Sequence, residues 1–294
     1  MDFRTDLAME RTAGLAGGQE GITVEKERHG PMETTWVRIR SADAARRLGK
    51  PEGSYWTMNH PQLPRMEPEQ RMGVAQEVAR VLRMLLPSSG DVLVLGLGNR
   101  RMTADALGAR TVEGVLVTRH LQEKQLRGVC ALSPGVLGVT GIETAELAQS
   151  LAERLHPAAV IVIDALAAME TSHICTTIQV TDTGIRPGSG VGNHRQGITA
   201  DTLHVPVIAL GVPMVVYAST IVRDALRHIM ARESTEHEAE AMAGELCKGM
   251  MEDMVVTPRD IDELVQGLAD LLALAINAAL QPAFGMEELS HYLH

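Results

Sequence analysis

The sequence predicts an α/β protein: a three-layer sandwich in which helices cover both faces of a mostly parallel central sheet, with a small α+β appendage at the N-terminus. From Asp91 onward, short apolar runs alternate with segments of helical periodicity, which is the pattern of a parallel α/β layer. Hydrophobic residues make up 45% of the 294 residues and aromatic residues only 2%, so the core must be built from aliphatic side chains and methionine. This length suits one large domain, or a domain with an appendage.

Residues 1–68 are expected to form an N-terminal segment that precedes an α/β domain of residues 69–294. The first 30 residues are polar and rich in glycine, and we expect them to be loosely held. The predicted elements after them are a half-exposed strand at 34–40, a short helix from Ser41 to Leu48 capped by Ser41, a short strand at 55–58, a proline-rich link at 59–68 and a helix at 69–86.

The α/β domain is expected to alternate between strands and helices. Strands are predicted at residues 91–95, 114–118, 159–163, 175–181 and 205–211, and helices at residues 103–112, 143–155, 218–232, 235–250 and 259–281. The most apolar long segment, residues 261–280, carries three carboxylates. It is therefore expected to be an amphipathic or buried helix of a soluble protein rather than a membrane span.

The charge and cysteine patterns argue against several classes of function. The net charge is −10, and the chain has no block of Lys or Arg and few aromatic side chains on which bases could stack, so we expect no nucleic-acid partner. The N-terminus lacks the apolar core of a signal peptide, and Cys130, Cys175 and Cys247 form no C-x-x-C pair. We therefore expect a cytoplasmic protein with reduced thiols and with no metal, cofactor or membrane partner.

Two aspartates that follow apolar strand runs are the candidate catalytic residues. The run Val92–Leu95 leads through a glycine turn and a polar loop to Asp105, and the run 158–163 ends directly on Asp164. If the two strands are neighbours in a parallel sheet, both carboxylates emerge at the edge where open α/β sheets keep their ligands. Two carboxylates in one small site share a proton, so one can hold it while the other activates water, as an acid-type peptidase requires. Taken singly, each aspartate could instead be an acid at a helix terminus.

The glycine turn after the first run allows a second interpretation. Gly96-x-Gly98 could cradle a phosphate group, and Gly98 and Asn99 are also candidates for contact with a substrate or an oxyanion. The third glycine of a dinucleotide motif and the Lys-Ser/Thr of a P-loop are both absent, so a tight strand-to-loop turn is the favoured interpretation.

Two further glycine-rich loops are candidates for contact with a substrate. Residues 133–144, with Thr140 and Glu143, either close over a substrate backbone or form a structural turn. Residues 181–195 form a long loop rich in turn formers, and such loops are more often functional than plain connections. Its candidate residues, whose backbone N–H groups could bind an extended peptide or an oxyanion, are Gly188, Ser189 and Gly190.

Taken together, these motifs closely resemble the germination protease family of spore-forming bacteria, in order along nearly the whole chain. The motifs that carry the resemblance are residues 4–8 (RTDLA), 94–99 (VLGLGN), 105–108 (DALG), 117–121 (VTRHL), 138–144 (GVTGIET), 163–167 (IDALA), 177–179 (TIQ), 182–185 (DTGI), 187–193 (PGSGVGN) and 206–213 (PVIALGVP). The sequence departs from the family pattern at Tyr217, where Asp is usual, and at Met169 and Glu170, where Arg-Ser is usual.

The resemblance implies an atypical aspartic endopeptidase that degrades small acid-soluble spore proteins during germination, made as a zymogen and assembled as a homotetramer in the cytoplasm of the forespore or spore core. It implies a fold related to the hydrogenase maturation peptidases. The family's two essential aspartates correspond to Asp105 and Asp164. The segment Arg4–Ala8 resembles the family's self-processing junction, so we expect cleavage between Asp6 and Leu7.

Two rival functions stay open at this point. The first is a metal-recognising peptidase of the hydrogenase-maturation type, which would lose activity when its metal is chelated. The second is a non-catalytic α/β module that binds a nucleotide, which the incomplete glycine motif disfavours.

Overall fold

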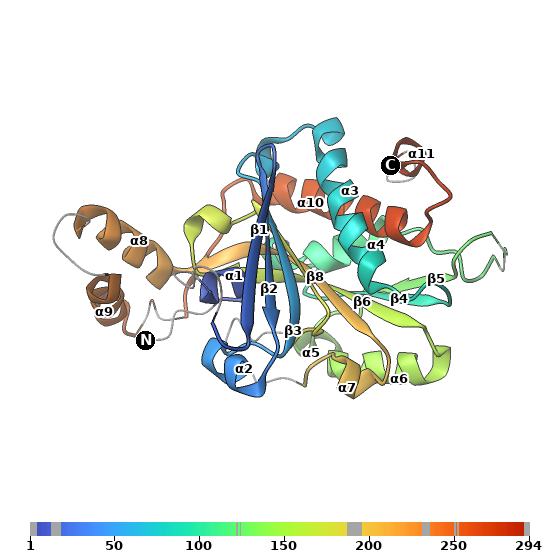
Figure 1. The fold of residues 1–294 in the computed structure, drawn as a ribbon, viewed down its shortest axis with the longest axis horizontal. Helices are drawn as coiled ribbons and strands as arrows, with labels where there is room; N and C mark the ends of the chain where they lie inside the picture. The colour runs from blue at the N-terminus through green and yellow to red at the C-terminus, as the bar shows by residue number, and fades with distance from the viewer. Residues whose placement is uncertain are drawn as a thin grey trace.

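A mixed sheet forms the centre of the computed structural model, with helices on both faces (Figure 1). The structure describes residues 5–12, 19–121, 123, 125–186, 196–230, 236–249, 251 and 253–290. Among these residues the sheet has nine strands, in the order β1-β2-β3-β7-β8-β6-β4-β5, and β9 pairs with β8.

The bounds of the strands are β1 (Ile22–His29), β2 (Met32–Ile39), β3 (Gly53–Asn59), β4 (Val92–Gly96), β5 (Val129–Leu132), β6 (Ala159–Ala168), β7 (Thr177–Thr181), β8 (Val207–Tyr217) and β9 (Val255–Val256). The α-helices are α1 (Ala8–Arg11), α2 (Ala42–Leu48), α3 (Pro68–Leu85), α4 (Leu107–Glu113), α5 (Leu137–Thr140), α6 (Thr144–Leu155), α7 (Ala200–Leu203), α8 (Ala218–Met230), α9 (Glu236–Leu246), α10 (Ile261–Leu280) and α11 (Met286–Ser290). Short 3₁₀ helices are η1 (Leu63–Arg65), η2 (Thr103–Asp105) and η3 (Thr171–His173).

The parallel part of the sheet consists of β5, β4, β6 and β8. Every residue of β4 is buried, and so is nearly every residue of β6 and β8, as expected for strands covered by helices on both faces. The strands predicted at 91–95, 159–163 and 205–211 are confirmed as β4, β6 and β8. The strands β6 and β8 continue well beyond the point where β4 ends at Gly96.

The N-terminal strands extend this sheet rather than standing beside it as an appendage. β1, β2 and β3 form an antiparallel meander, and β3 pairs with β7, which in turn runs antiparallel to β8. The sheet is therefore mixed, with its parallel part confined to four strands. The expectation that residues 1–30 are loosely held is wrong for the described ones, because residues 22–29 form β1 and Leu7 and Ala8 are fully buried. The boundary at residue 68 stays a prediction.

The strand predicted at residues 114–118 is absent from this part of the described chain, and the partner of β4 is β5 instead. Two backbone groups of the segment form hydrogen bonds with a side chain of α10. Asn277 Oδ1 accepts a hydrogen bond from Leu116 N at 2.9 Å, and Asn277 Nδ2 donates one to Gly114 O at 2.9 Å. Gly114 N and Val115 N donate back into α4, and Thr118 N donates to Val129 O, so these backbone groups are satisfied without a strand ladder.

Helices enclose the parallel strands from both sides. α3, α4 and α10 pack over one face, against side chains such as Ile161 and Ile163, while α6 and α7 cover the other face, against Val160 and Val162 (Figure 1). α10 is long and apolar enough to cross a membrane by composition, but 78% of its most apolar window is buried inside the protein. The prediction of an amphipathic or buried helix there is confirmed.

Candidate active site

Asp105 and Asp164 lie at the same end of the parallel strands. Where β4 stops, Leu97 N donates a hydrogen bond of 2.8 Å to Ile163 O, the residue before Asp164. The short helix η2, which ends at Asp105, contacts both β6 and β8. Gly108, just after it, lies so close that an added Cβ would be 2.4 Å from Ile163 O. The segments that carry the two aspartates are therefore packed directly on one another.

The carboxylate of Asp105 is held by the loop that precedes it. Asp105 Oδ2 accepts a hydrogen bond from Asn99 N at 2.7 Å. Gly98 has a φ of +96°, and a Cβ at this position would lie 1.9 Å from Asp105 O. A left-handed residue in this space must be glycine. Gly98 and Asn99 therefore position Asp105, and close backbone packing explains the glycine turn without a phosphate.

Asp164 lies within β6 and not at its end, because β6 runs on to Ala168. Its side chain is largely buried, and Oδ1 accepts a hydrogen bond of 2.9 Å from Ala165 N. Across the sheet Asp164 pairs with Gly211 of β8. Gly211 has no side chain, and Leu166 packs in the space beside the aspartate that a side chain there would take. A Cβ added to Gly211 would lie 2.7 Å from Leu166 Cγ.

The expected processing junction lies against β6, a few residues beyond Asp164. Asp6 N donates to Ala167 O at 2.9 Å, and Ala167 N donates back to Asp6 Oδ2 at 2.9 Å. Leu7 is fully buried in a small apolar cluster with Leu166 and other residues of β6 and β8. The structure thus places Asp6 and Leu7 against β6 at Leu166 and Ala167, two and three residues beyond Asp164.

A buried carboxylate in α1, which the sequence analysis missed, fixes this segment to the end of β6. Glu10 accepts hydrogen bonds from Met169 N at 2.7 Å and from Glu170 N at 3.0 Å, and His173 Nδ1 lies 2.6 Å from Glu10 Oε1. Burial lowers the pKa of His173, but the hydrogen bond and charge of Glu10 outweigh burial, so the pKa is raised overall. Because Glu10 binds main-chain amides, the departures from the family pattern at 169 and 170 leave these bonds intact.

Lys50 and Gln179 were also missed, although both contact the Asp6 carbonyl oxygen. Gln179 gave a usable signal, since it is a polar residue inside a strand whose five residues are all buried. Lys50 gave none, because a lysine after the glycine that ends a short helix is ordinary in a sequence.

The remaining candidates are not brought to the aspartates by any contact that the structure describes. Thr140 forms hydrogen bonds within its own turn, to Val136 O and to Ile142 N, and Glu143 precedes the first turn of α6. These contacts fit the structural-turn interpretation of that loop. Gly188, Ser189 and Gly190 lie outside the described residues.

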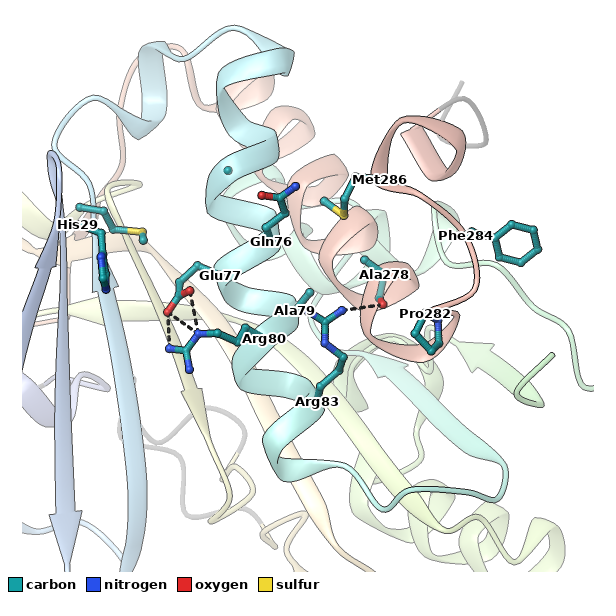
Figure 2. A pocket seen from close by; sticks show the side chains of 12 residues that line it. His29, Gln76, Glu77, Ala79, Arg80, Arg83, Ala278, Pro282, Phe284 and Met286 are labelled. Atoms are coloured by element: carbon teal, nitrogen blue, oxygen red, sulfur yellow. Dashed lines mark hydrogen bonds and ion pairs between the residues drawn. The ribbon is translucent and has the colours of Figure 1, made fainter. Parts of the chain in front are cut away.

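A cavity of about 570 Å³ lies elsewhere, between β1, β2, α3 and the α10–α11 region (Figure 2). Its charged side chains are already engaged: Arg80 forms an ion pair with Glu77, and Arg83 donates to Ala278 O. Neither aspartate lines it. Within the described ranges, no cluster of three His, Cys, Asp or Glu side chains is arranged to hold a metal ion.

Three of the relatives that match this chain over its whole length carry the same description. The chain is 38% identical to the germination protease of Caldanaerobacter subterraneus subsp. tengcongensis, covering 100% of this chain and 99% of that protein. It is 35% identical to the germination protease of Clostridium tetani, covering 100% of both, and 34% identical to that of Bacillus subtilis, covering 99% of this chain and 97% of that protein.

Among solved structures, a [NiFe] hydrogenase maturation protease, HycI from Thermococcus kodakarensis, is similar to 67% of this chain and 98% of its own length, with 16% identity and a TM-score of 0.34. The model of the germination protease family matches residues 5–243. With that match and with relatives aligned end to end, the resemblance read from the motifs is confirmed, and this chain belongs to the germination protease family.

Proposed function

We propose that this chain is an endopeptidase that initiates the degradation of small acid-soluble spore proteins, with Asp105 and Asp164 as the pair that activates water. Membership of its family makes it a protease with a role in spore germination. The observation that carries the aspartate proposal is the direct packing of the two segments, through the hydrogen bond between Leu97 N and Ile163 O and the close approach of Gly108 to Ile163.

In the proposed mechanism, the ionised member of the pair takes a proton from a water molecule as that water attacks the carbonyl carbon of the peptide bond. The neutral member donates its proton to the departing amide nitrogen, and the carbon–nitrogen bond breaks. The pair ends with its proton on the other carboxylate. Because coupled carboxylates titrate as a unit, the roles belong to the pair and not to one residue. The mechanism requires no cofactor.

We further propose that the chain is a zymogen cleaved between Asp6 and Leu7, that it assembles as a homotetramer, and that it acts in the cytoplasm of the forespore or spore core. The position of Asp6 and Leu7 against β6, close to Asp164, supports the first of these. The departure at Tyr217 lies at the end of β8, away from the rung of the sheet that holds Asp164.

The test replaces each aspartate by a side chain of equal size without charge. Asp105→Asn and Asp164→Asn should each abolish cleavage of a purified small acid-soluble protein, while circular dichroism and the melting temperature stay near those of the wild type. Turnover near the wild-type rate in either variant would rule out the pair. Activity that disappears in EDTA and returns with added nickel or zinc would instead favour a metal-dependent peptidase.

A further inference from the structure

Two side chains converge on the carbonyl oxygen of Asp6, at the proposed cleavage junction. Lys50 Nζ and Gln179 Nε2 each donate a hydrogen bond of 3.0 Å to this oxygen. Lys50 follows the glycine that ends α2, and Gln179 belongs to β7, so the two donors come from separate elements. Two donors on one carbonyl oxygen, one of them an ammonium group, form an arrangement that stabilises negative charge on that oxygen.

The peptide that carries this oxygen is fixed on both sides. On the N-terminal side, Asp6 N donates to Ala167 O at 2.9 Å. On the C-terminal side, Ala8 N donates to Gln179 Oε1 at 2.8 Å, and the buried Leu7 side chain packs with Leu166. The side-chain amide of Gln179 therefore contacts both sides of the junction: its Nε2 donates to Asp6 O and its Oε1 accepts from Ala8 N. The bond between Asp6 and Leu7 is presented in one orientation.

The sheet places this carbonyl oxygen on the face that carries Asp164. Gln179 and Asp164 both pair with Gly211, one from each side of β8, so the three residues form one rung of the sheet. Side chains in one rung point to the same face. Leu166, which packs with Leu7, is two residues beyond Asp164 and also on that face. Gly211, between the aspartate and the glutamine, has no side chain, and Leu166 packs over it, with its Cγ 2.7 Å from where a Cβ would lie.

The electrostatic setting of Lys50 fits a group that acts on this peptide. Its side chain is half-buried, and Nζ also donates to Thr5 O at 3.1 Å. Burial lowers the pKa of Lys50, while the charges of Asp6 and Glu10 oppose that decrease. An ammonium group with little water around it interacts more strongly with charge that develops on a bound oxygen.

We infer that Lys50 and Gln179 form the oxyanion site for hydrolysis of the Asp6–Leu7 bond. This inference rests on the proposed self-processing. Water, deprotonated by the ionised aspartate, forms a bond to the Asp6 carbonyl carbon, and the electron pair of the carbonyl moves onto the oxygen that Lys50 and Gln179 hold. When the carbon–nitrogen bond breaks, the neutral aspartate supplies the proton to Leu7 N. The products are a carboxylic acid on Asp6 and a free amine on Leu7, which become a carboxylate and an ammonium group when the acid proton passes to the amine.

The experiment follows the appearance of the Leu7 N-terminus by intact mass, using the full-length chain at mildly acid pH. Lys50→Met keeps the aliphatic stem and removes the charge. Gln179→Glu keeps an acceptor for Ala8 N and removes the donor to Asp6 O. Each variant should slow processing by about 10²-fold, the usual effect of losing one oxyanion donor, with a melting temperature near that of the wild type. Lys50→Arg, which keeps a cationic donor, should process faster than Lys50→Met.

Lys248→Met is the matched control, because Lys248 is exposed and paired only with the neighbouring Glu245 in the described structure; it should process at the wild-type rate. If Lys50 and Gln179 only anchored the junction, the opposite result would be expected, because releasing the junction would leave the rate of processing unchanged or raise it. Wild-type or faster processing in both Lys50→Met and Gln179→Glu would therefore overturn the oxyanion inference and leave the proposed self-processing standing. An intact N-terminus in the wild type would overturn the proposed processing itself, and the inference with it.

Discussion

Glu10 and His173 form a buried hydrogen-bonded pair that makes stability depend on pH. The pKa of His173 is raised above its ordinary value near 6.5 because Glu10 outweighs the effect of burial. A histidine whose pKa is raised on folding contributes stability that is fully present below about pH 6.5 and is lost as the pH rises through the folded value. The pair therefore holds α1 on the end of β6 most firmly under mildly acid conditions.

The expected result is that His173→Asn lowers the free energy of unfolding more at pH 6 than at pH 9. Urea unfolding at both pH values measures the difference. His29→Asn is the control, because His29 and its partner Glu27 are both exposed on β1 and surface pairs contribute little. A deficit in His173→Asn that is the same at both pH values would contradict the assigned linkage.

At the scale of single residues, the sequence could predict the aspartates but not their surroundings. Asp105 and Asp164 follow apolar runs, so local pattern was sufficient to place both near the end of β4, although β6 continues past Asp164 to Ala168. Their catalytic role stays a prediction. Lys50 and Gln179 reach Asp6 from positions 44 and 173 residues away along the chain. Such contacts depend on how the N-terminal segment folds back over the sheet, which no local pattern encodes.

Among the elements, α10 does more than fill the core. Asn277, which is 1% exposed, satisfies the backbone of the extended segment that precedes β5. Its neighbour one turn on, Gln281, accepts from Arg127 N at 3.1 Å and donates to Arg127 O at 2.8 Å. The side-chain amides of Asn277 and Gln281, at the C-terminal end of α10, thus fix two backbone segments that precede β5: residues 114–116 and Arg127.

Asn277→Leu should destabilise the protein by about 1–3 kcal/mol, because it removes the hydrogen-bond partner of Leu116 N and Gly114 O, which are only partly exposed to water. Thermal or urea unfolding measures the loss. Gln266→Leu on the exposed side of the same helix is the control and should change stability by less than about 0.5 kcal/mol. Equal effects of the two substitutions would show that the amide of Asn277 contributes nothing beyond its packing.

This element also explains where the prediction of strands failed. The buried strands β4, β6 and β8 were predicted because continuous apolar runs mark them. Residues 114–118 have the same apolar character but form no strand in the described structure, because their backbone groups bond to α4, to the Asn277 side chain and, at Thr118, to Val129 O. β1 was missed for the opposite reason: most of its residues are polar and exposed, so its sequence lacks the alternation that marks a half-buried strand.

For the whole molecule, the question is whether the N-terminal strands form a unit of their own. β3 pairs with β7 over five residue pairs, Tyr55 with Thr181 through Asn59 with Thr177. This pairing makes β1–β3 part of the central sheet. The sequence could not predict it, because β3 and β7 are more than a hundred residues apart and their pairing requires the α/β part to be folded.

The two tryptophans of the chain allow a direct test, because both lie in the N-terminal strands. Trp36 and Trp56 pair across β2 and β3 with ring centroids 5.5 Å apart. Their fluorescence reports on these strands, whereas far-UV circular dichroism reports mainly on helices elsewhere. The expected result is one midpoint of thermal unfolding by both probes, as for a single cooperative unit. Two separate midpoints would support an independent unit that ends near residue 68.

The burial of Leu7 has a consequence for how the proposed maturation depends on protein concentration. Leu7 is fully buried in an apolar cluster that includes residues of β6 and β8, and the adjacent carbonyl oxygen accepts hydrogen bonds from Lys50 and Gln179. A second copy of the enzyme cannot bind this peptide bond unless the segment first detaches from the sheet. The proposed maturation is therefore expected to be intramolecular in the folded state. Its half-time should then stay the same when the protein is diluted.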